Sequence, residues 1–240
     1  MDELLETALI GEIMSKHMQG SLSDLKKKLL TMGGMVEEAV ERAVQLLREP
    51  DVDEADHIIT GDRAIDELEL EIDDECLKVL ALYQPVAEDL RFVSTVMKIN
   101  NDLERVADLA VNTARRARDL KKPLRPELSE PIQLATKRII KMLRNGLNAF
   151  VERDPITARK VIQADDAIDR YHSKMIKKLI SYMTRHPGNI EDGVQLLWVS
   201  RNLERIADHI TNMGEDIVYM VEGETIRHRK DQTPPGRLTM

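Results

Sequence analysis

Acidic residues spaced four apart are the residues of this chain whose types could do chemistry. Four such pairs stand out: Asp62 with Asp66, Glu104 with Asp108, Asp165 with Asp169, and Glu204 with Asp208. Residues four apart lie on one face of a helix, so each pair presents two carboxylates together. Such hard oxygen ligands suit iron, manganese, magnesium or calcium, and they suit copper or zinc less well because histidine and cysteine are absent from the pattern.

The same spacing has an alternative interpretation as a solvent-facing surface of salt bridges. Acidic residues are 43 of 240, so some pairs at this spacing arise by chance. Like charges four apart destabilise a helix by about 0.2–0.5 kcal/mol. Arg105 and Arg205 stand three residues before their aspartates and would offset that repulsion without a metal. Only the recurrence of the pairs at matching positions favours metal binding, and the pattern alone leaves both interpretations open.

This recurrence belongs to an internal duplication of the chain. Residues 103–108 read LERVAD and match residues 203–208, LERIAD, at an offset of 100 positions. Upstream, residues 62–66 (DRAID) match residues 165–169 (DDAID) at an offset of 103. The small change of offset falls near the breaks at Pro85 and Pro187, where insertions cost least. A period near 100 residues is too long for a solenoid repeat and predicts a duplicated helical bundle.

Six amphipathic segments carry these motifs. Hydrophobic residues recur three and four apart along most of the chain, and aromatic residues are only 3% of it, which favours an aliphatic helical core. Prolines interrupt the pattern between segments. Helices are predicted from residue 22 to a break at 48–51, and then at about 53–82, 87–120, 129–152, 156–185 and 189–222.

We therefore predict an all-α fold of two tandem three-helix bundles. The first bundle is expected at 21–122 after a lead-in at 1–20, and the second at 129–226 after a linker at 123–128. The tail, 227–240, has no hydrophobic period and is expected to be disordered.

Composition excludes several classes of protein. The net charge of −8 argues against nucleic acid as a partner. One cysteine, Cys76, excludes a disulfide framework and a cysteine-based zinc site. The acidic N-terminus lacks the features of a signal peptide, and no apolar run approaches the roughly 18 residues of a membrane span. We expect a soluble, cytoplasmic protein without a transmembrane segment.

Other candidate residues are weaker. Glu54 and His57 form an E-x-x-H pair as in di-iron bundles, but those need a second copy and two further glutamates. His172 follows Asp169 by three residues, yet its counterpart in the first unit is Glu69, so it is a minor metal-ligand candidate. Trp198 stands where the first unit has Lys98 and is expected to pack between helices. No phosphate loop, nucleophile elbow or catalytic triad is visible, so no catalytic or cofactor-binding residue is predicted.

Basic clusters occur at residues 26–28, at Arg115, Arg116 and Arg118, and at residues 137–138. No aromatic residues are interleaved with them. A solvated helix face is the default interpretation, and docking to an acidic partner or to lipid headgroups is the functional alternative.

Three motifs together resemble the PhoU family of phosphate-transport regulators. They are residues 32–37 (MGGMVE), residues 84–91 (QPVAEDLR) and the duplicated LER(V/I)AD, and the resemblance covers about residues 15–228. It implies two tandem three-helix bundles and metal sites at the eight carboxylates of the four acidic pairs, with iron, manganese, magnesium or zinc as the candidate cations. The second unit lacks the QPVAEDLR segment, so any partner that contacts this loop would contact the first unit alone.

The resemblance also implies a function. It predicts a non-enzymatic adaptor in phosphate homeostasis and signal transduction, a homodimer that is held near the inner membrane through its partners. These would be the ATPase subunit of a phosphate ABC transporter and a phosphate-responsive sensor histidine kinase, and the protein would repress phosphate uptake and the starvation regulon. The alternative is a carboxylate-rich helical protein that stores metal or uses it in catalysis.

Overall fold

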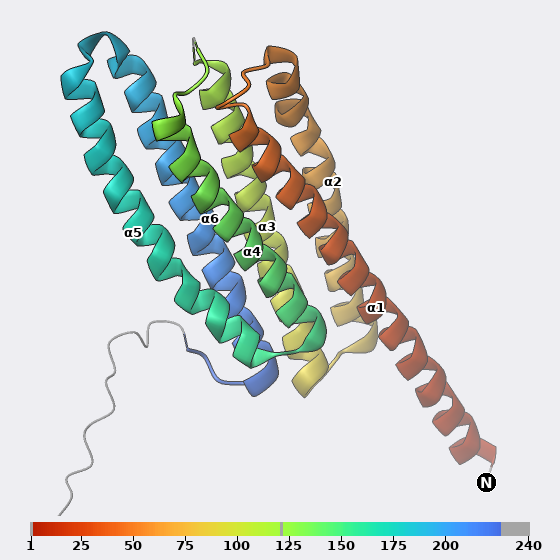
Figure 1. Ribbon diagram of the computed structural model, residues 1–240. Coiled ribbons are helices and arrows are strands. Elements are labelled where there is room, and N and C mark those ends of the chain that lie inside the picture. Colours follow the sequence, from red (N-terminus) through yellow and green to blue (C-terminus); the bar gives the residue numbers. More distant parts are fainter. Residues whose placement is uncertain (1, 121, 227–240) are drawn as a thin grey trace, which may run out of the picture.

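The computed structural model describes residues 2–120 and 122–226, with side chains described from Met14 onward. These residues form six α-helices and one short 3-10 helix, with no strand among them. The helices are α1 (Asp2–Gln45), α2 (Val52–Tyr83), α3 (Ala87–Arg118), α4 (Pro126–Glu152), α5 (Pro155–Arg185) and α6 (Ile190–Glu222), with η1 (Pro187–Asn189) before the last (Figure 1). The predicted all-α fold is confirmed. The predicted disordered tail lies outside the described residues.

Equivalent aspartates begin the middle helix of each unit. Asp51 caps α2 by accepting a hydrogen bond from the backbone N–H of Glu54 at 3.0 Å. Asp154, at the duplicated position, caps α5 by accepting from the N–H groups of Ile156 and Thr157. Such caps satisfy donors that the first helical turn leaves unpaired. The breaks at Pro50 and Pro155 therefore separate two helices, and the aspartate beside each proline also caps the start of the next helix.

Two boundaries differ from the sequence prediction. The lead-in expected at 1–20 is not separate, because α1 begins at Asp2 and runs through it. No proline interrupts this stretch, and Gly11 and Gly20 weaken a helix by only about 1 kcal/mol each. The first turns of α1 extend beyond the rest of the bundle (Figure 1). The linker expected at 123–128 is shorter, since α4 begins at Pro126, a residue well suited to the first helical turn.

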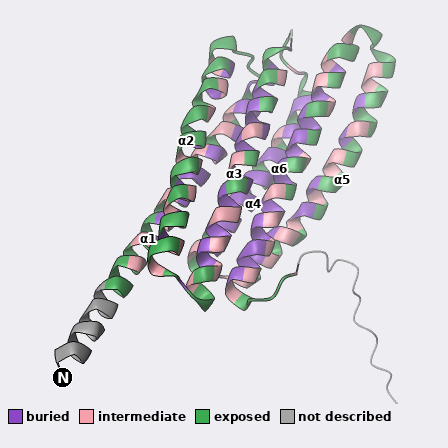
Figure 2. Cartoon of the chain, turned by 180° about the vertical axis from the view of Figure 1, so that it is seen from behind, coloured by how far each residue is buried: buried purple, intermediate pink, exposed green. Residues whose placement is uncertain are grey.

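The two units share one layer of four helices. Helices α2, α3, α6 and α5 follow one another in that order, with α1 packed against α2 and α3, and α4 packed against α5 and α6. Helices α1 and α4 also touch each other, so they cover the same face of the layer. The buried faces of all six helices join in one hydrophobic cluster (Figure 2). The duplicated bundles are therefore fused through a common core, and the opposite face of α3 and α6 is left open.

Helices α3 and α6 cross-link the units along their whole length. Asn202 donates a hydrogen bond to Thr113 Oγ1 at 3.2 Å, and His209 Nδ1 lies 2.9 Å from Asp102 Oδ1. Lys98 pairs with Asp216 farther along. Residue numbers fall along α6 as they rise along α3, so the two helices are antiparallel. This arrangement makes the two halves of the interface related by an approximate twofold axis.

Two adjacent glycines of α1 differ in their surroundings, which gives a stability prediction. A Cβ on Gly33 would lie 2.4 Å from the Leu147 side chain of α4, whereas a Cβ on Gly34 would meet nothing within 4 Å. We expect Gly34→Ala to raise the free energy of unfolding by about 0.5–1 kcal/mol through helix propensity. Gly33→Ala should gain less, because Leu147 has to move. Urea unfolding of both variants tests this, and equal gains would contradict the close approach of α1 and α4.

Candidate carboxylate sites

In the first unit, the predicted carboxylates of α2 and α3 face each other. The pKa of Asp62 is raised to about 6, chiefly by burial and then by the charges of Asp66 and Asp108. A nearby negative charge disfavours ionisation, so this shift shows that Asp108 of α3 acts on Asp62 of α2. The two acidic pairs predicted from the sequence are therefore brought to one face of the α2–α3 pair.

Glu104 is the most enclosed member of this group on α3. Burial raises its pKa, the Arg105 guanidinium lowers it, and the charges of Asp108, Glu69 and Asp66 raise it further. Its Oε2 atom is buried without a hydrogen-bond partner among the described residues, although Arg105 Nε lies 3.3 Å away. The guanidinium is thus near enough to attract the charge but not aligned to satisfy the oxygen. A buried acceptor in this state favours a cation.

Glu69 is a fifth carboxylate of this site, and the sequence analysis missed it as a candidate. Burial and the charges of Asp73 and Asp66 raise its pKa, while Arg105 lowers it. The buried side chain of Asn100 donates hydrogen bonds to Glu69 O at 3.0 Å and to Asp73 Oδ1 at 3.1 Å, which fixes α2 against α3 beside the site. The available signal was the continuation of the 62–66 pair by one further helical turn, to position 69.

The second unit also brings predicted carboxylates of α5 and α6 near each other. Burial raises the pKa of Glu204, and the charges of Asp208 and Asp169 raise it further. Glu204 Oε1 pairs with Arg201 at 2.6 Å, while Oε2 is buried without a hydrogen-bond partner among the described residues. Asp165 is almost fully buried on α5. The charges of Asp208 on α6 and Asp169 on α5 therefore both act on Glu204, and Asp165 lies one helical turn from Asp169.

His172 makes the two sites chemically different. It occupies the position of Glu69 in the duplication, and its Nδ1 lies 2.8 Å from Ser200 Oγ. Burial and the charge of Arg201 lower the pKa of His172, so the imidazole is neutral at pH 7. A neutral imidazole is a nitrogen ligand for a metal. The second site thus offers nitrogen where the first offers another carboxylate.

The donor sets fit hard cations in type, and the side chains are near each other without forming a closed cage. Among the described residues, no three histidine, cysteine or acidic side chains converge on one point. Side-chain rotation would therefore have to accompany binding. The E-x-x-H candidate is engaged elsewhere, because Arg42 pairs with Glu54 at 2.6 Å and lowers its pKa.

Acid stability gives a test of the first site. Between pH 3.8 and about 6 the folded protein retains a proton on Asp62 that the unfolded chain has lost. Stability therefore falls as pH rises through this window, and stays lower above it. Without added metal, we expect the melting temperature of Asp62→Asn to fall less between pH 5 and pH 7 than that of the wild type. Parallel pH profiles of the two proteins would contradict the raised pKa of Asp62.

Within the described part of the chain, no helix is long and apolar enough to cross a membrane.

Comparisons with known proteins identify the fold and the family. The PhoU domain matches the chain twice, at residues 29–117 and 132–217, one copy in each unit. A crystal structure of PhoU from Pseudomonas aeruginosa superposes with a TM-score of 0.81 at 35% identity, covering 86% of this chain and 99% of that one. The phosphate transport system regulatory protein PhoU from Streptococcus pneumoniae gives 0.81 at 32% identity, over 87% and 99% of the two chains. The tandem helical bundles predicted from the duplication are confirmed.

Curated relatives have the same name. The phosphate-specific transport system accessory protein PhoU homolog of Pseudomonas putida is 36% identical over 216 residues, 90% of this chain and 84% of the relative. The phosphate-specific transport system accessory protein PhoU of Escherichia coli is 31% identical over 219 residues, 90% of this chain and 91% of the relative. Two domain matches, two similar folds and relatives aligned over nearly the whole chain show that this chain belongs to the PhoU family.

Proposed function

We propose that this protein negatively regulates phosphate uptake and the phosphate-starvation regulon. It acts as a non-enzymatic adaptor between the ATPase subunit of a phosphate ABC transporter and a sensor histidine kinase. The observation that carries the proposal is the alignment of about 90% of the chain with relatives named accessory proteins of the phosphate-specific transport system. The proposal includes a cytoplasmic protein that reaches the membrane through its partners and forms a homodimer.

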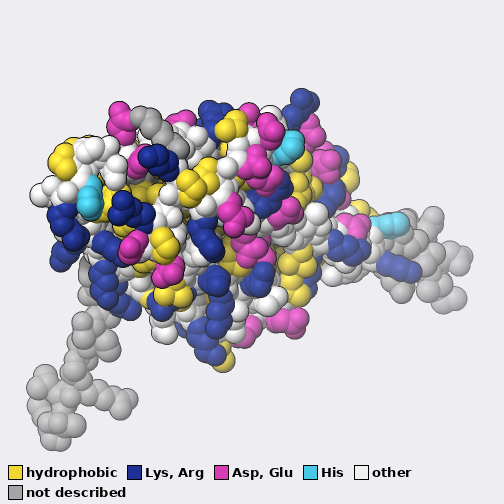
Figure 3. All heavy atoms as spheres, turned by 45° about the horizontal axis from the view of Figure 1, so that its top comes forward, with side chains coloured by type: hydrophobic (Ala, Val, Ile, Leu, Met, Phe, Trp, Pro, Cys, Tyr) yellow, Lys and Arg dark blue, Asp and Glu magenta, His cyan; other side chains and the backbone are white. Residues whose placement is uncertain are grey.

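The surface of the protein supports action through contacts with other proteins. Lysine, arginine, aspartate and glutamate are interspersed with hydrophobic side chains over the end of the bundle seen in Figure 3. Several large hydrophobic side chains are more than half exposed, among them Val86, Ile156 and Trp198. Interfaces combine apolar anchors with a polar rim in this way.

Deleting the gene tests the regulatory role. We expect phosphate-starvation genes to stay on in high phosphate when the gene is absent, and a plasmid copy to restore repression. Measuring a reporter from one starvation promoter at high and low phosphate checks this. Normal repression in the deletion strain, with no second copy of the gene present, would contradict the proposal.

We further propose that the carboxylate sites bind metal cations, with iron, manganese, magnesium and zinc as candidates. The support is chemical: hard oxygen donors at duplicated positions, raised carboxyl pKa values at Asp62, Glu69, Glu104 and Glu204, and a buried, unsatisfied oxygen on each glutamate of the LER motif. When bound, a cation would add positive charge to that of the neighbouring arginines. Metal analysis of the purified protein measures occupancy, and turnover of ferrous iron with oxygen would favour the alternative of a storage or redox protein.

A further inference from the structure

The approximate twofold axis between α3 and α6 allows the two ends of one interface to be compared. Lys98 and Trp198 are equivalent in the duplication, and so are Arg116 and Asp216, each at an offset of 100 positions. The pair Lys98–Asp216 at one end of the interface therefore corresponds to the pair Trp198–Arg116 at the other. Because both ends lie on the same antiparallel pair of helices, α3 and α6, the difference between these pairs is not required by that pairing.

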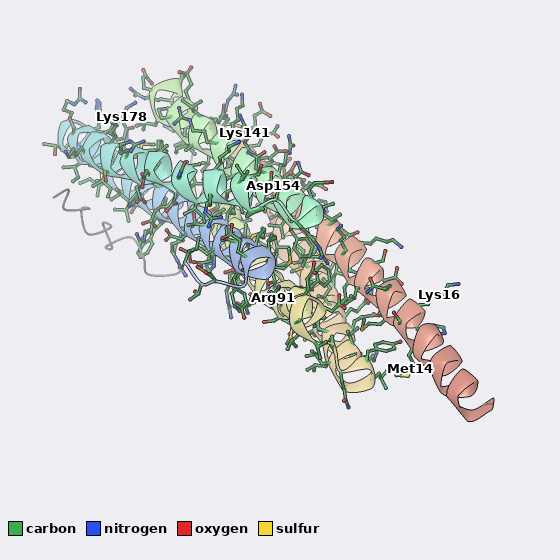
Figure 4. The ribbon with its side chains drawn as sticks, turned by 90° about the horizontal axis from the view of Figure 1, so that it is seen from below. Met14, Lys16, Arg91, Lys141, Asp154 and Lys178 are labelled. Atoms are coloured by element: carbon green, nitrogen blue, oxygen red, sulfur yellow. The ribbon has the colours of Figure 1, made fainter. Side chains whose placement is uncertain are left out.

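At the first end, opposite charges close the interface. Lys98 Nζ lies 3.0 Å from Asp216 Oδ1, and the Asp216 side chain is only 2% exposed. The ammonium group also lies 5.2 Å from the centre of the Tyr219 ring. The nearby backbone is tied as well, since Arg91 Nε donates to Met220 O at 3.1 Å (Figure 4). This end combines a cation, a buried carboxylate and an aromatic ring.

At the second end, a cation stands where the carboxylate is expected. The Arg116 guanidinium lies 5.5 Å from the centre of the Trp198 ring, and its Nη1 donates to Gln195 Oε1 at 3.4 Å. Both of these partners are neutral. The indole is 52% exposed, contrary to the expectation that Trp198 packs between helices. The reason is geometric, because its flat ring lies under the arginine at the open edge of the interface. Among the described residues, this end has a cation and an aromatic ring, with Arg116 at the position that corresponds to Asp216.

An exposed apolar row leads up to this position. Ile190, Val194 and Trp198 are spaced four residues apart on α6 and are 48%, 40% and 52% exposed. They share one face of the helix over a length of about 12 Å. Of the neighbouring arginines on α3, Arg118 pairs with Asp56 at 2.8 Å, and Arg115 donates to Asn112. Tryptophan and arginine are the residues most enriched in the energetic centres of interfaces.

We propose that the row of Ile190, Val194 and Trp198, together with Arg116, docks an acidic amphipathic helix of a protein partner. A carboxylate of that helix forms an ion pair with Arg116, as Asp216 does with Lys98 at the other end of the interface. The inference rests on the proposed adaptor function and names the chemistry of the partner at this surface. Three apolar positions four residues apart match the apolar stripe of about two turns of a partner helix.

Charge complementarity favours an acidic protein segment over a membrane. The arginines beside the row attract carboxylates, and arginine binds a carboxylate through two parallel hydrogen bonds. A flat anionic bilayer would also meet the acidic residues around the row, among them Glu191 and Asp192 in the first turn of α6. A partner helix that lies along the row can place its carboxylates at Arg116, at the end of the row away from Glu191 and Asp192.

Binding measurements on the full-length protein test the proposal. The probes are the purified ATPase subunit of the phosphate transporter and the purified cytoplasmic part of the sensor kinase from the same organism. We expect Trp198→Ala and Arg116→Glu each to weaken binding of one of these proteins by at least about tenfold. Arg116→Lys, which retains the charge, should lose much less, and the affinity of Arg116→Glu should depend less on salt than that of the wild type.

Matched exposed positions serve as controls. Ile180 on α5 is 53% exposed, and Arg63 on α2 is an exposed arginine paired with Glu67. Ile180→Ala and Arg63→Glu should change affinity less than twofold. Unchanged circular dichroism of Trp198→Ala would show that the fold is retained.

Each outcome decides between the proposals. Wild-type binding that neither Trp198→Ala nor Arg116→Glu weakens would overturn the docking surface and leave the adaptor function standing. A wild type that binds neither protein would overturn both. Losses seen only in binding to vesicles of anionic lipid, or only in self-association by sedimentation, would overturn the choice of an acidic protein helix as the occupant.

Discussion

Replacing Glu104 by glutamine together with Asp108 by asparagine is expected to abolish the metal-dependent stabilisation proposed for the first unit. A ligand that binds only the folded protein adds about 2.7 kcal/mol at 100 times its dissociation constant. The metal-free variant should be slightly more stable than the metal-free wild type. Burial and neighbouring carboxylates raise the pKa of Glu104, so ionising it costs free energy, and two charges about 4 Å apart repel by about 4 kcal/mol at an effective dielectric of 20.

Melting curves with chelator, and with added iron, manganese, magnesium or zinc, measure this effect. Glu204→Gln with Asp208→Asn should remove the contribution of the second unit independently. A matched control on α2 is Glu67→Gln with Glu71→Gln, an exposed acidic pair at the same spacing whose members pair with Arg63 and Lys28. If chelator leaves the wild-type melting temperature unchanged and none of the four metals raises it, the acidic faces are solvated surface.

The sequence was sufficient to predict the helices and their grouping. Leu25, Leu29, Met32 and Val36 recur at helical spacing, and all four are buried in the core. Proline and the duplicated aspartate caps at Asp51 and Asp154 mark where the helices of each unit end and begin. These signals are local, because spacing and capping depend on neighbours in the chain. The start of α1 was missed because no residue in the first 20 positions ends a helix, and a weak hydrophobic period does not end one either.

The sites were predictable only in part, since they depend on how one helix is rotated against another. Asp62, Asp66, Glu104 and Asp108 were found because each pair shares a helix. Glu69 joins them only because Asn100 fixes α2 against α3. Similarly, the residue equivalent to His209 in the first unit is Leu109, so the repeat gives no signal for this histidine. Only the antiparallel packing of α3 on α6 places His209 beside Asp102.

The duplication carries more information about function when its two copies are compared in space. The sequence pairs Lys98 with Trp198 and Asp216 with Arg116 as equivalent positions. The structure shows that each residue's partner in space belongs to the other unit. Departures from the repeat at such positions are not required by the shared fold. Positions at which the two copies differ in this way are therefore candidates for residues that give one unit its own binding specificity.

Phe150→Ala is expected to lower the free energy of unfolding by about 3–5 kcal/mol. Phe150 lies on α4 of the second unit, is fully buried, and stacks on Phe92 of α3 in the first unit, with 5.4 Å between ring centres. Arg153, at the end of α4, lies over the Phe92 ring and pairs with Glu88 at the start of α3. Truncation of Phe150 therefore leaves a cavity at a junction that joins both units.

Because the core is continuous, this loss should shift one cooperative transition of the whole protein. Urea unfolding followed both by circular dichroism and by the fluorescence of Trp198, which lies in the second unit, measures the shift. Leu134→Ala is the matched control on α4: Leu134 is 56% exposed, and its truncation should change stability by less than about 0.5 kcal/mol. Two separate transitions, of which Phe150→Ala moves only one, would mean that the bundles fold independently. The stacked rings of Phe92 and Phe150 would then be a contact between two domains that fold separately. A single transition that shifts as a whole would instead show that the rings belong to one continuous core.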